Sequence, residues 1–228
     1  MISTDTTDDL HATFTPDGRT VYFVRRVPDG RFTIMYSRFD DAGWSEARVA
    51  PFSGRYADQE PFVSADGRRL YFTSDRPLTG TDAVRGREAW VVERSGSGWG
   101  EPRRLEAPIR VPRSAAPADP EPGRFWGQAR GPAEGPDGAL YFWAERPGSL
   151  GHTDLYRAPA VPEPVAFDEP ENLGPPISSE YFETGAAFSP DGLVLVFGRD
   201  EDPDGFGLGD LFMSRRSSTQ PLLYRELE

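Results

Sequence analysis

The stretch Thr13-Phe14-Thr15-Pro16-Asp17-Gly18, followed by Thr20-Val21-Tyr22-Phe23, decides the fold of this chain. In such a stretch proline presets φ for a turn, aspartate hydrogen-bonds its own backbone, and glycine takes a positive φ. Short β-branched and aromatic runs flank the turn, which is the pattern of two antiparallel strands. The stretch therefore predicts a β-hairpin.

The hairpin pattern recurs three times. The matching stretches are Phe62-Val63-Ser64-Ala65-Asp66-Gly67 with Leu70-Tyr71-Phe72, Gly135-Pro136-Asp137-Gly138 with Leu140-Tyr141-Phe142, and Ala187-Phe188-Ser189-Pro190-Asp191-Gly192 with the run 193–197. Each hairpin is followed by a third apolar run, and two repeats then close on Gly43-Trp44 and Gly98-Trp99. Four strands per repeat are typical of a propeller blade. The sequence thus predicts an all-β protein, a small β-propeller with four blades of four antiparallel strands.

The repeats also define the expected organisation of the 228 residues. We expect one propeller domain over 1–228, which is an ordinary length for a single domain. Its predicted repeats cover approximately 11–55, 56–107, 124–176 and 180–228. The segment 107–124 alternates proline, alanine and charged residues without a strand pattern. It is therefore interpreted as a surface insertion, either a solvated linker or a lid.

The repeats resemble the TolB-type WD-like β-propeller repeat family. Blades of that family carry a Ser-Pro-Asp-Gly turn, an aromatic Tyr-Phe strand, a Gly-x-Asp-Leu/Ile-Tyr strand and a closing Trp-x-x-Pro strand. The resemblance covers nearly the whole chain, from about His11 to Arg216, and Asp154 and Asp210 match the third-strand aspartate. The fourth repeat ends in Pro221-Leu222-Leu223-Tyr224 without the tryptophan. The resemblance implies a propeller, a fold found in binding domains and in hydrolase accessory domains.

Composition and charge exclude several classes of function. The chain holds 25 Lys and Arg against 37 Asp and Glu, for a net charge of −12. We therefore expect neither nucleic-acid nor anionic-membrane binding. The absence of cysteine excludes disulfides and thiolate chemistry. Because no signal peptide is visible, the sequence as written predicts a cytoplasmic protein, or a periplasmic or secreted one if a leader has been removed.

Candidate site residues lie in the segments that lead into the innermost strands, since propellers place function at the mouths of the central channel. Alignment on the Asp-Gly turns gives His11 and Glu60 equivalent places. A second set of equivalent places holds Asp9, Asp58 and Glu183. Four blades would aim these groups at one mouth.

The chemistry of these residue types suggests two roles. Converging carboxylates cannot all stay ionised, so one can serve as general acid beside a general base, with a histidine as proton shuttle. The catalytic residues, if the protein is an enzyme, are predicted to be His11, Glu60, Asp58 and Glu183. Arginine can hold an anionic group and aromatic rings can stack on a ligand. The predicted ligand-binding residues are Asp9, Tyr56, Trp126, Gln128, Arg130 and Tyr181. In the family, polar residues at these places also bond backbone groups between blades, so a structural role stays open.

A separate acidic stretch has the D-x-D-x-D-G spacing of calcium loops. The predicted ligands are Asp200, Asp202, Asp204 and Asp210. The twelfth position is Leu211 where an EF-hand has glutamate, and the stretch lies between predicted strands. A solvated acidic turn is the alternative. No cofactor is expected other than calcium in this reading.

The sequence favours a binding module that presents the channel mouth to a small molecule, glycan or peptide. The alternative is a hydrolase, lyase or cyclase that uses acid/base residues at the same mouth, and a second alternative is a calcium-stabilised scaffold. We expect a monomer, with a ring-completing oligomer as the alternative, because an open ring exposes strand edges.

Overall fold

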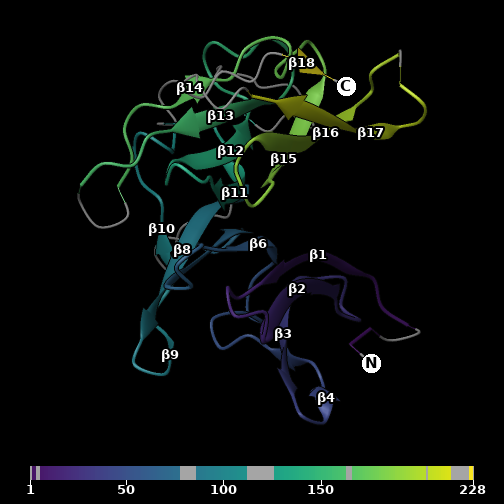
Figure 1. The fold of residues 1–228 in the computed structure, drawn as a ribbon, viewed down its shortest axis with the longest axis vertical. Coiled ribbons are helices and arrows are strands. Elements are labelled where there is room, and N and C mark those ends of the chain that lie inside the picture. Colours follow the sequence, from purple (N-terminus) through teal and green to yellow (C-terminus); the bar gives the residue numbers. More distant parts are fainter. Residues whose placement is uncertain are drawn as a thin grey trace. The chain divides into compact units, whose positions relative to one another are not determined.

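The computed structural model describes residues 2–3, 6–77, 86–111, 126–162, 166–203, 205–216 and 226–227. Within these residues the regular structure consists of β-strands alone (Figure 1). The described part of the chain has no helix that is long and apolar enough to cross a membrane. These residues group into two compact units, Met1–Leu105 and Glu106–Glu228. That the whole chain forms one domain stays a prediction.

The unit Met1–Leu105 contains two antiparallel sheets, named blades 1 and 2. Blade 1 consists of β1 (Asp9–Phe14), β2 (Thr20–Arg26), β3 (Phe32–Asp40), β4 (Gly43–Trp44) and β5 (Arg48–Val49). Blade 2 consists of β6 (Asp58–Val63), β7 (Arg69–Ser74), β8 (Glu88–Ser95), β9 (Gly98–Trp99) and β10 (Arg103–Arg104). Both blades have five strands where the sequence predicts four, because the outermost strand is divided into two short pieces that pair with β3 or with β8.

The unit Glu106–Glu228 contains two further antiparallel sheets, named blades 3 and 4. Blade 3 consists of β11 (Arg130–Glu134), β12 (Leu140–Ala144), β13 (Asp154–Ala158) and β14 (Glu171–Asn172). Blade 4 consists of β15 (Phe182–Phe188), β16 (Val194–Asp200), β17 (Gly209–Arg215) and β18 (Glu226–Leu227). The four sheets confirm the predicted all-β fold of four propeller blades. The predicted closing segment Pro221 to Tyr224 lies outside the described residues.

The Asp-Gly turns adopt the predicted hairpin geometry. Gly18 has φ 68°, a value that glycine takes without the Cβ penalty of other residues. In the same turn Thr15 Oγ1 donates to Asp17 Oδ1 at 2.6 Å. Ser64 donates to Asp66 in the same way in blade 2, and Ser189 to Asp191 in blade 4. The hydroxyl and the carboxylate therefore fix the turn that joins the two inner strands of each of these three blades.

Apolar side chains between neighbouring blades form the cores of the two units. In the first unit Ile34 of blade 1 and Phe72 of blade 2 are 0% exposed and belong to one cluster. In the second unit Leu155 of blade 3 and Leu195 of blade 4 play the same part. Burial of a Leu, Ile or Phe side chain stabilises a fold by roughly 1.5–3 kcal/mol. Each blade is therefore held by the face that it shares with its neighbour in the unit.

The beginning of the predicted insertion is buried. Ile109 is 2% exposed and Val111 is 9% exposed, although both lie in the segment 107–124. Arg146 Nη2 donates to Pro108 O at 3.1 Å, which ties this turn to blade 3. Ile109 and Val111 are thus core residues, and the first part of the predicted surface insertion is a buried connection that leads into blade 3. Residues 112–125 lie outside the described part of the structure.

Candidate functional site: the bulges of the inner strands

Each inner strand carries a bulge at the same place. The register with the second strand shifts between Leu10 and Thr13 in β1 and between Gln59 and Phe62 in β6. It shifts in the same way between residues 130 and 133 in β11 and between residues 184 and 187 in β15. One left-handed residue lies in each shift: His11 with φ 50°, Glu60 with φ 54°, Gly131 with φ 56° and Gly185 with φ 63°. The structure therefore places His11 and Glu60 at equivalent positions, as the sequence alignment predicts.

The bulge positions of blades 1 and 2 are strained. A left-handed conformation costs a residue with a Cβ roughly 1–2 kcal/mol relative to glycine. Blades 3 and 4 avoid this cost with Gly131 and Gly185, whereas blades 1 and 2 carry histidine and glutamate. Strained residues of this kind cluster at functional sites, which makes His11 and Glu60 candidate site residues.

The two strained residues lie on adjoining strands. The N–H of Val63 in β6, three residues after Glu60, donates to Thr13 Oγ1 in β1, two residues after His11, at 3.2 Å. The His11 side chain is exposed, and Glu60 is half-buried. Glu60 Oε2 accepts a hydrogen bond from Thr73 Oγ1 at 2.6 Å. The adjoining inner strands of blades 1 and 2 therefore carry an imidazole and a carboxylate at equivalent positions.

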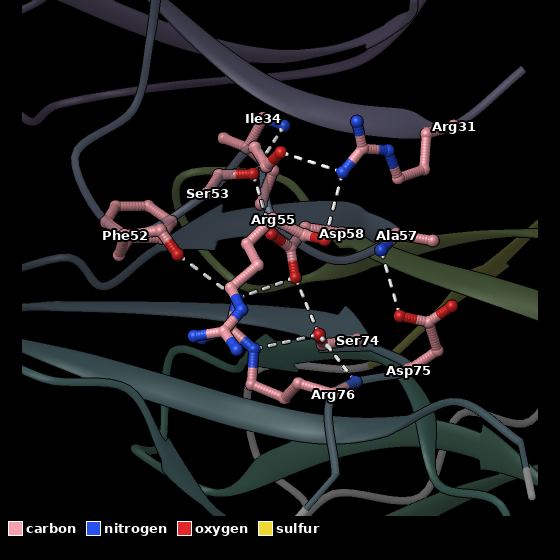
Figure 2. Close-up of polar contacts among 11 residues, drawn as sticks. Arg31, Ile34, Phe52, Ser53, Arg55, Ala57, Asp58, Ser74, Asp75 and Arg76 are labelled. Atoms are coloured by element: carbon pink, nitrogen blue, oxygen red, sulfur yellow. Dashed lines mark hydrogen bonds and ion pairs between the residues drawn. The ribbon is translucent and has the colours of Figure 1, made fainter. Parts of the chain in front are cut away.

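Asp58, another of the predicted catalytic residues, is buried. Its side chain is 0% exposed and accepts three side-chain hydrogen bonds (Figure 2). Ser74 Oγ donates to Oδ1 at 2.6 Å, Arg76 Nη2 to Oδ1 at 2.8 Å, and Ser53 Oγ to Oδ2 at 2.7 Å. Burial raises the pKa of Asp58, against the opposing effects of Arg76 and the two hydroxyls.

Arg76 connects Asp58 to the segment between blades 1 and 2. Its Nη2 also donates to Phe52 O at 3.1 Å. The guanidinium lies over the rings of Phe72, Trp90 and Tyr56, with its carbon 4.9, 5.2 and 5.4 Å from their centroids. Figure 2 shows Phe52, Ser53 and Asp58 of the segment 52–58 meeting Ser74 and Arg76 at the end of β7. The network thus anchors the connection to blade 2.

Arg31 fastens the same connection from blade 1. Its Nη1 donates to Gly54 O and Arg55 O at 2.9 Å each. The Arg55 guanidinium carbon lies 5.2 Å from the centroid of Tyr56. The Tyr56 ring, predicted to bind a ligand, therefore contacts two arginines and is half-buried.

Blades 4 and 1 repeat the pairing of acid and arginine. Glu183 is 0% exposed, accepts from Arg199 Nε at 2.8 Å, and accepts from both the N–H and the hydroxyl of Ser179. Arg199 Nη2 donates to Ile177 O at 3.1 Å, in the connection between blades 3 and 4. Burial raises the pKa of Glu183, and hydrogen bonds from Ser179 oppose that shift. In blade 1, Asp9 accepts from Arg25 at 2.8 and 3.0 Å.

These contacts explain the carboxylates of Asp9, Asp58 and Glu183 without a bound ligand being required. Asp58 and Glu183 are enclosed and each is paired with an arginine, so neither carboxylate reaches solvent. They match the structural role that the sequence left open, because each ties a connection to the blade that follows it. Sequence reasoning missed the arginine partners, although Arg25, Arg76 and Arg199 all stand at the ends of second strands. A catalytic role for Asp58 and Glu183 stays a prediction that these contacts do not favour.

The remaining predicted ligand-binding residues belong to the second unit. Ala129 takes the place of the acid in blade 3, between Gln128 and Arg130. Arg130 is 8% exposed, and its guanidinium carbon lies 4.4 Å from the Trp143 ring centroid. Trp126, Gln128 and Tyr181 are half-buried. That these side chains share one mouth with those of blades 1 and 2 stays a prediction.

The predicted calcium ligands are partly engaged with other groups. Asp202 Oδ2 accepts from Arg199 Nη1 at 3.3 Å, and Asp210 Oδ2 accepts from the N–H of Phe206 at 2.9 Å. Partial burial and the neighbouring Glu201 raise the pKa of Asp200. Asp204 lies outside the described residues. Among the residues that the structure describes, no three His, Asp or Glu side chains form a group that could hold a metal ion, and calcium binding stays a prediction.

Asp154, which matches the third-strand aspartate of the family, is fully buried without a cationic partner among the described residues. Its Oδ2 accepts from the N–H of Leu150 at 2.7 Å and from Asn172 Nδ2 at 2.6 Å. Its Oδ1 has no hydrogen-bond partner in the described part of the chain. Burial raises the pKa of Asp154 above the ordinary value of 3.8.

We expect Asp154→Asn to weaken the pH dependence of stability. A carboxyl group with a higher pKa in the folded state binds its proton more tightly there, so the free energy of unfolding falls as the pH rises from the unfolded pKa through the folded one. Asparagine retains the acceptor for Leu150 and Asn172 and does not ionise, so the variant should lose this fall. Denaturant titrations from about pH 4 to about pH 8 measure the effect. Asp154→Ala, which removes the acceptor, should instead lose about 1–3 kcal/mol at every pH. An unchanged pH profile in Asp154→Asn would contradict the prediction.

Comparison with known proteins identifies the fold and not the activity. No protein-family model matches the sequence, and no curated protein matches it significantly. A putative TolB from Agrobacterium tumefaciens has 17% identity and a TM-score of 0.61, over 100% of this chain and 67% of that one. TolB from Acinetobacter baumannii has 17% identity and a TM-score of 0.58, over 92% of this chain and 41% of that one. An α-L-arabinofuranosidase from Lactobacillus brevis has 15% identity and a TM-score of 0.57, over 95% of this chain and 70% of that one.

The coverage shows that this chain is shorter than the proteins it is similar to, since it spans less than half of the Acinetobacter TolB. At these identities the likeness is one of fold alone. With its four blade sheets and these resemblances, the chain has a TolB-like β-propeller fold.

Proposed function

We propose that the chain is a ligand-binding module whose binding surface surrounds His11 and Glu60. The observation that carries the proposal is that blades 1 and 2 retain these side chains at left-handed positions, where blades 3 and 4 have glycine. The strain costs stability and gives the inner edge of the first unit an imidazole and a carboxylate. A polar ligand at that edge would account for their presence.

The chemistry of the two groups favours a ligand rich in hydroxyl groups. A carboxylate accepts hydrogen bonds from two hydroxyls at once, and a neutral imidazole both donates and accepts. The exposed imidazole of His11 and the carboxylate of Glu60 supply both functions on adjoining strands. The likeness to an arabinofuranosidase supports a sugar as the first ligand to test. We therefore propose a glycan or a related hydroxylated small molecule.

The test compares His11→Gly and Glu60→Gly with the wild-type protein. Relief of the left-handed strain, less the entropy cost of glycine, should raise the stability of His11→Gly by about 0.5–1 kcal/mol. For Glu60→Gly the loss of the Thr73 hydrogen bond, worth about 1 kcal/mol, should cancel that gain. Both variants should bind the ligand at least about tenfold more weakly, a loss of about 1.4 kcal/mol. Thermal shifts with a panel of monosaccharides and oligosaccharides, followed by calorimetry, measure stability and affinity on the same samples.

Glu201→Gly is the matched control. Glu201 has φ 64° and is exposed on the β16–β17 connection of blade 4, so its replacement relieves similar strain and leaves the His11 and Glu60 side chains unchanged. It should gain stability and bind as the wild-type protein does. Wild-type affinity in both His11→Gly and Glu60→Gly would show that the strained residues do not contact the ligand. A panel in which no sugar binds would contradict the ligand class.

The same pair of residues carries the alternative in the enzyme class. An imidazole and a carboxylate on adjoining strands can transfer protons to and from a bound substrate. Chromatography of the ligand after incubation with the protein separates the two functions, because a binding module returns it unchanged. Turnover that is lost in Glu60→Gln while affinity remains would assign the site to catalysis.

A further inference from the structure

Arg146, at the end of β12, lacks the carboxylate that its counterpart in blade 2 has. It follows Phe142 by four residues, as Arg76 follows Phe72 at the end of β7. Arg76 Nη2 lies 2.8 Å from Asp58 Oδ1 in a buried ion pair. Among the residues that the structure describes, no carboxylate forms an ion pair with Arg146.

The other surroundings of the two arginines match. Arg146 Nη2 donates to Pro108 O at 3.1 Å, and Nη1 lies 3.5 Å from Ile109 O, both in the connection that leads into blade 3. The counterpart arginine donates in the same way, also at 3.1 Å, to a carbonyl of the connection into blade 2. The guanidinium carbon of Arg146 lies 5.9 and 5.3 Å from the ring centroids of Phe142 and Tyr156. In blade 2 two aromatic rings at the same register lie 4.9 and 5.2 Å from the guanidinium carbon.

Two alanines replace the groups that accept hydrogen bonds from Arg76. Asp58 stands two residues before the bulge residue of its inner strand, and Ala129 has that place in blade 3. Ser74 stands two residues before its arginine, and Ala144 has that place. Arg76 donates to both the carboxylate and the hydroxyl in blade 2. Beside its guanidinium, blade 3 therefore lacks one carboxylate and one hydroxyl.

The missing carboxylate leaves the positive charge of Arg146 without compensation. Its side chain is half-buried, and burial lowers the pKa of the guanidinium, against the smaller opposing effects of Tyr156 and Glu169. In blade 1 the hydrogen bond with Asp9 instead raises the pKa of Arg25. A charge removed from water costs free energy unless it is paired. Because Arg146 is half-buried and not enclosed, a small anion has access to it.

We propose that Arg146 binds the carboxylate group of a small ligand, which takes the place that the Asp58 carboxylate has in blade 2. Alanine differs from aspartate by one carboxylate, so the replacement at Ala129 removes a group of the size that the ligand supplies. A planar carboxylate accepts two parallel hydrogen bonds from a guanidinium, which favours it over a tetrahedral anion.

This anion site and the proposed sugar site are separate. Arg146, Ala129, Ala144 and the contacts of the guanidinium all belong to the unit Glu106–Glu228, whereas His11 and Glu60 belong to the unit Met1–Leu105. The proposal goes beyond the binding of a hydroxylated ligand, because it requires a negatively charged group.

The experiment records ¹⁵N–¹H NMR spectra of the arginine Nε–H groups in the intact chain, with sodium acetate as the probe. Acetate replaces sodium chloride at constant ionic strength. The signal of Arg146 should move and reach saturation. The signal of Arg157 should stay in place, and it is the matched control in the same spectrum, because Arg157 is half-buried in the same blade and already paired with Asp137 at 2.6 Å. Arg146→Gln and Arg157→Gln each remove one signal and assign the two. If Arg146→Gln does not fold, Arg146→Lys also removes the Nε–H signal.

The stability of the variants gives a second measurement. Acetate should raise the folding equilibrium constant of the wild-type protein and of Arg157→Gln by about elevenfold at ten times the Kd, compared with chloride. Arg146→Gln should lack this gain, while general salt effects act on all three proteins alike. Ala129→Asp supplies the missing carboxylate from the chain itself, so its Arg146 signal should no longer respond to acetate.

Three results would overturn the proposal. They are an Arg146 signal that acetate does not move in the wild-type protein, one that sodium phosphate moves and acetate does not, and a response to acetate that persists in Ala129→Asp. His11→Gly should respond to acetate as the wild-type protein does. Failure of the proposed sugar site would therefore leave the acetate result unchanged.

Discussion

Replacement of Asp58 with alanine should lower the free energy of unfolding by about 3–5 kcal/mol, because it leaves a buried arginine without its counter-charge. The side chain of Arg76 is 7% exposed, and its Nη2 lies 2.8 Å from Asp58 Oδ1. The same change removes the acceptor of the Ser53 and Ser74 hydroxyls. Urea or guanidinium titration at neutral pH measures the loss.

Two further variants separate the charge effect from general damage. Asp9→Ala breaks the equivalent pair in blade 1, where Asp9 and Arg25 are each 12% exposed, and should cost about 1 kcal/mol because solvent replaces part of the interaction. Asp58→Ala combined with Arg76→Met removes both buried charges and should recover part of the loss. If Asp58→Ala lowers the free energy of unfolding no more than Asp9→Ala does, the buried Asp58–Arg76 pair does not have the predicted structural importance.

Replacement of Phe72 with alanine should lower the free energy of unfolding by about 3–5 kcal/mol, the usual cost of a cavity left by a phenylalanine. Phe72 is 0% exposed in the cluster shared by blades 1 and 2. Its ring lies 5.4 Å from that of Phe52 and 4.9 Å from the guanidinium carbon of Arg76. The change therefore also removes an apolar contact of Arg76, the ion-pair partner of Asp58.

Calorimetry or denaturant titration measures the effect of Phe72→Ala, with Phe39→Ala as control. Phe39 is 48% exposed on the outer part of blade 1 and should lose less than about 1 kcal/mol. Because Phe72 and Arg76 are in contact, the losses from Phe72→Ala and Asp58→Ala should not add in the double variant. Similar losses from Phe72→Ala and Phe39→Ala would contradict a core shared by the two blades.

The proposed sugar site rests on an unusual backbone. His11 and Glu60 have left-handed φ values at the bulge where blades 3 and 4 have glycine. Comparison of one repeat with another identifies these two residues, and affinity for sugars tests the proposal.

Local patterns in the sequence were enough to predict the blades. The turns around Asp17, Asp66, Asp137 and Asp191 form as predicted, because aspartate and glycine, preceded by proline in three of the four, determine φ and hydrogen bonding within a few residues. The equivalence of His11 with Glu60 also followed from the sequence, since distance from the turn fixes register along a strand. The divided outer strands were not predicted, because pairs of two residues carry almost no periodicity.

Only the tertiary structure decided what the candidate residues do. The sequence predicted Asp58 and Glu183 to be catalytic acids. The position of a carboxylate before an inner strand is the same whether its side chain is exposed or buried, so the sequence could not distinguish the two cases. Their arginines stand 16 to 18 residues away along the chain and meet them only when the hairpin closes. The left-handed φ of His11 and Glu60 arises from the bulge, which depends on pairing with the second strand. The sequence by itself determined the turns, strands and repeats, whereas burial, charge pairing and strain depend on contacts between distant residues and appeared only in the folded chain.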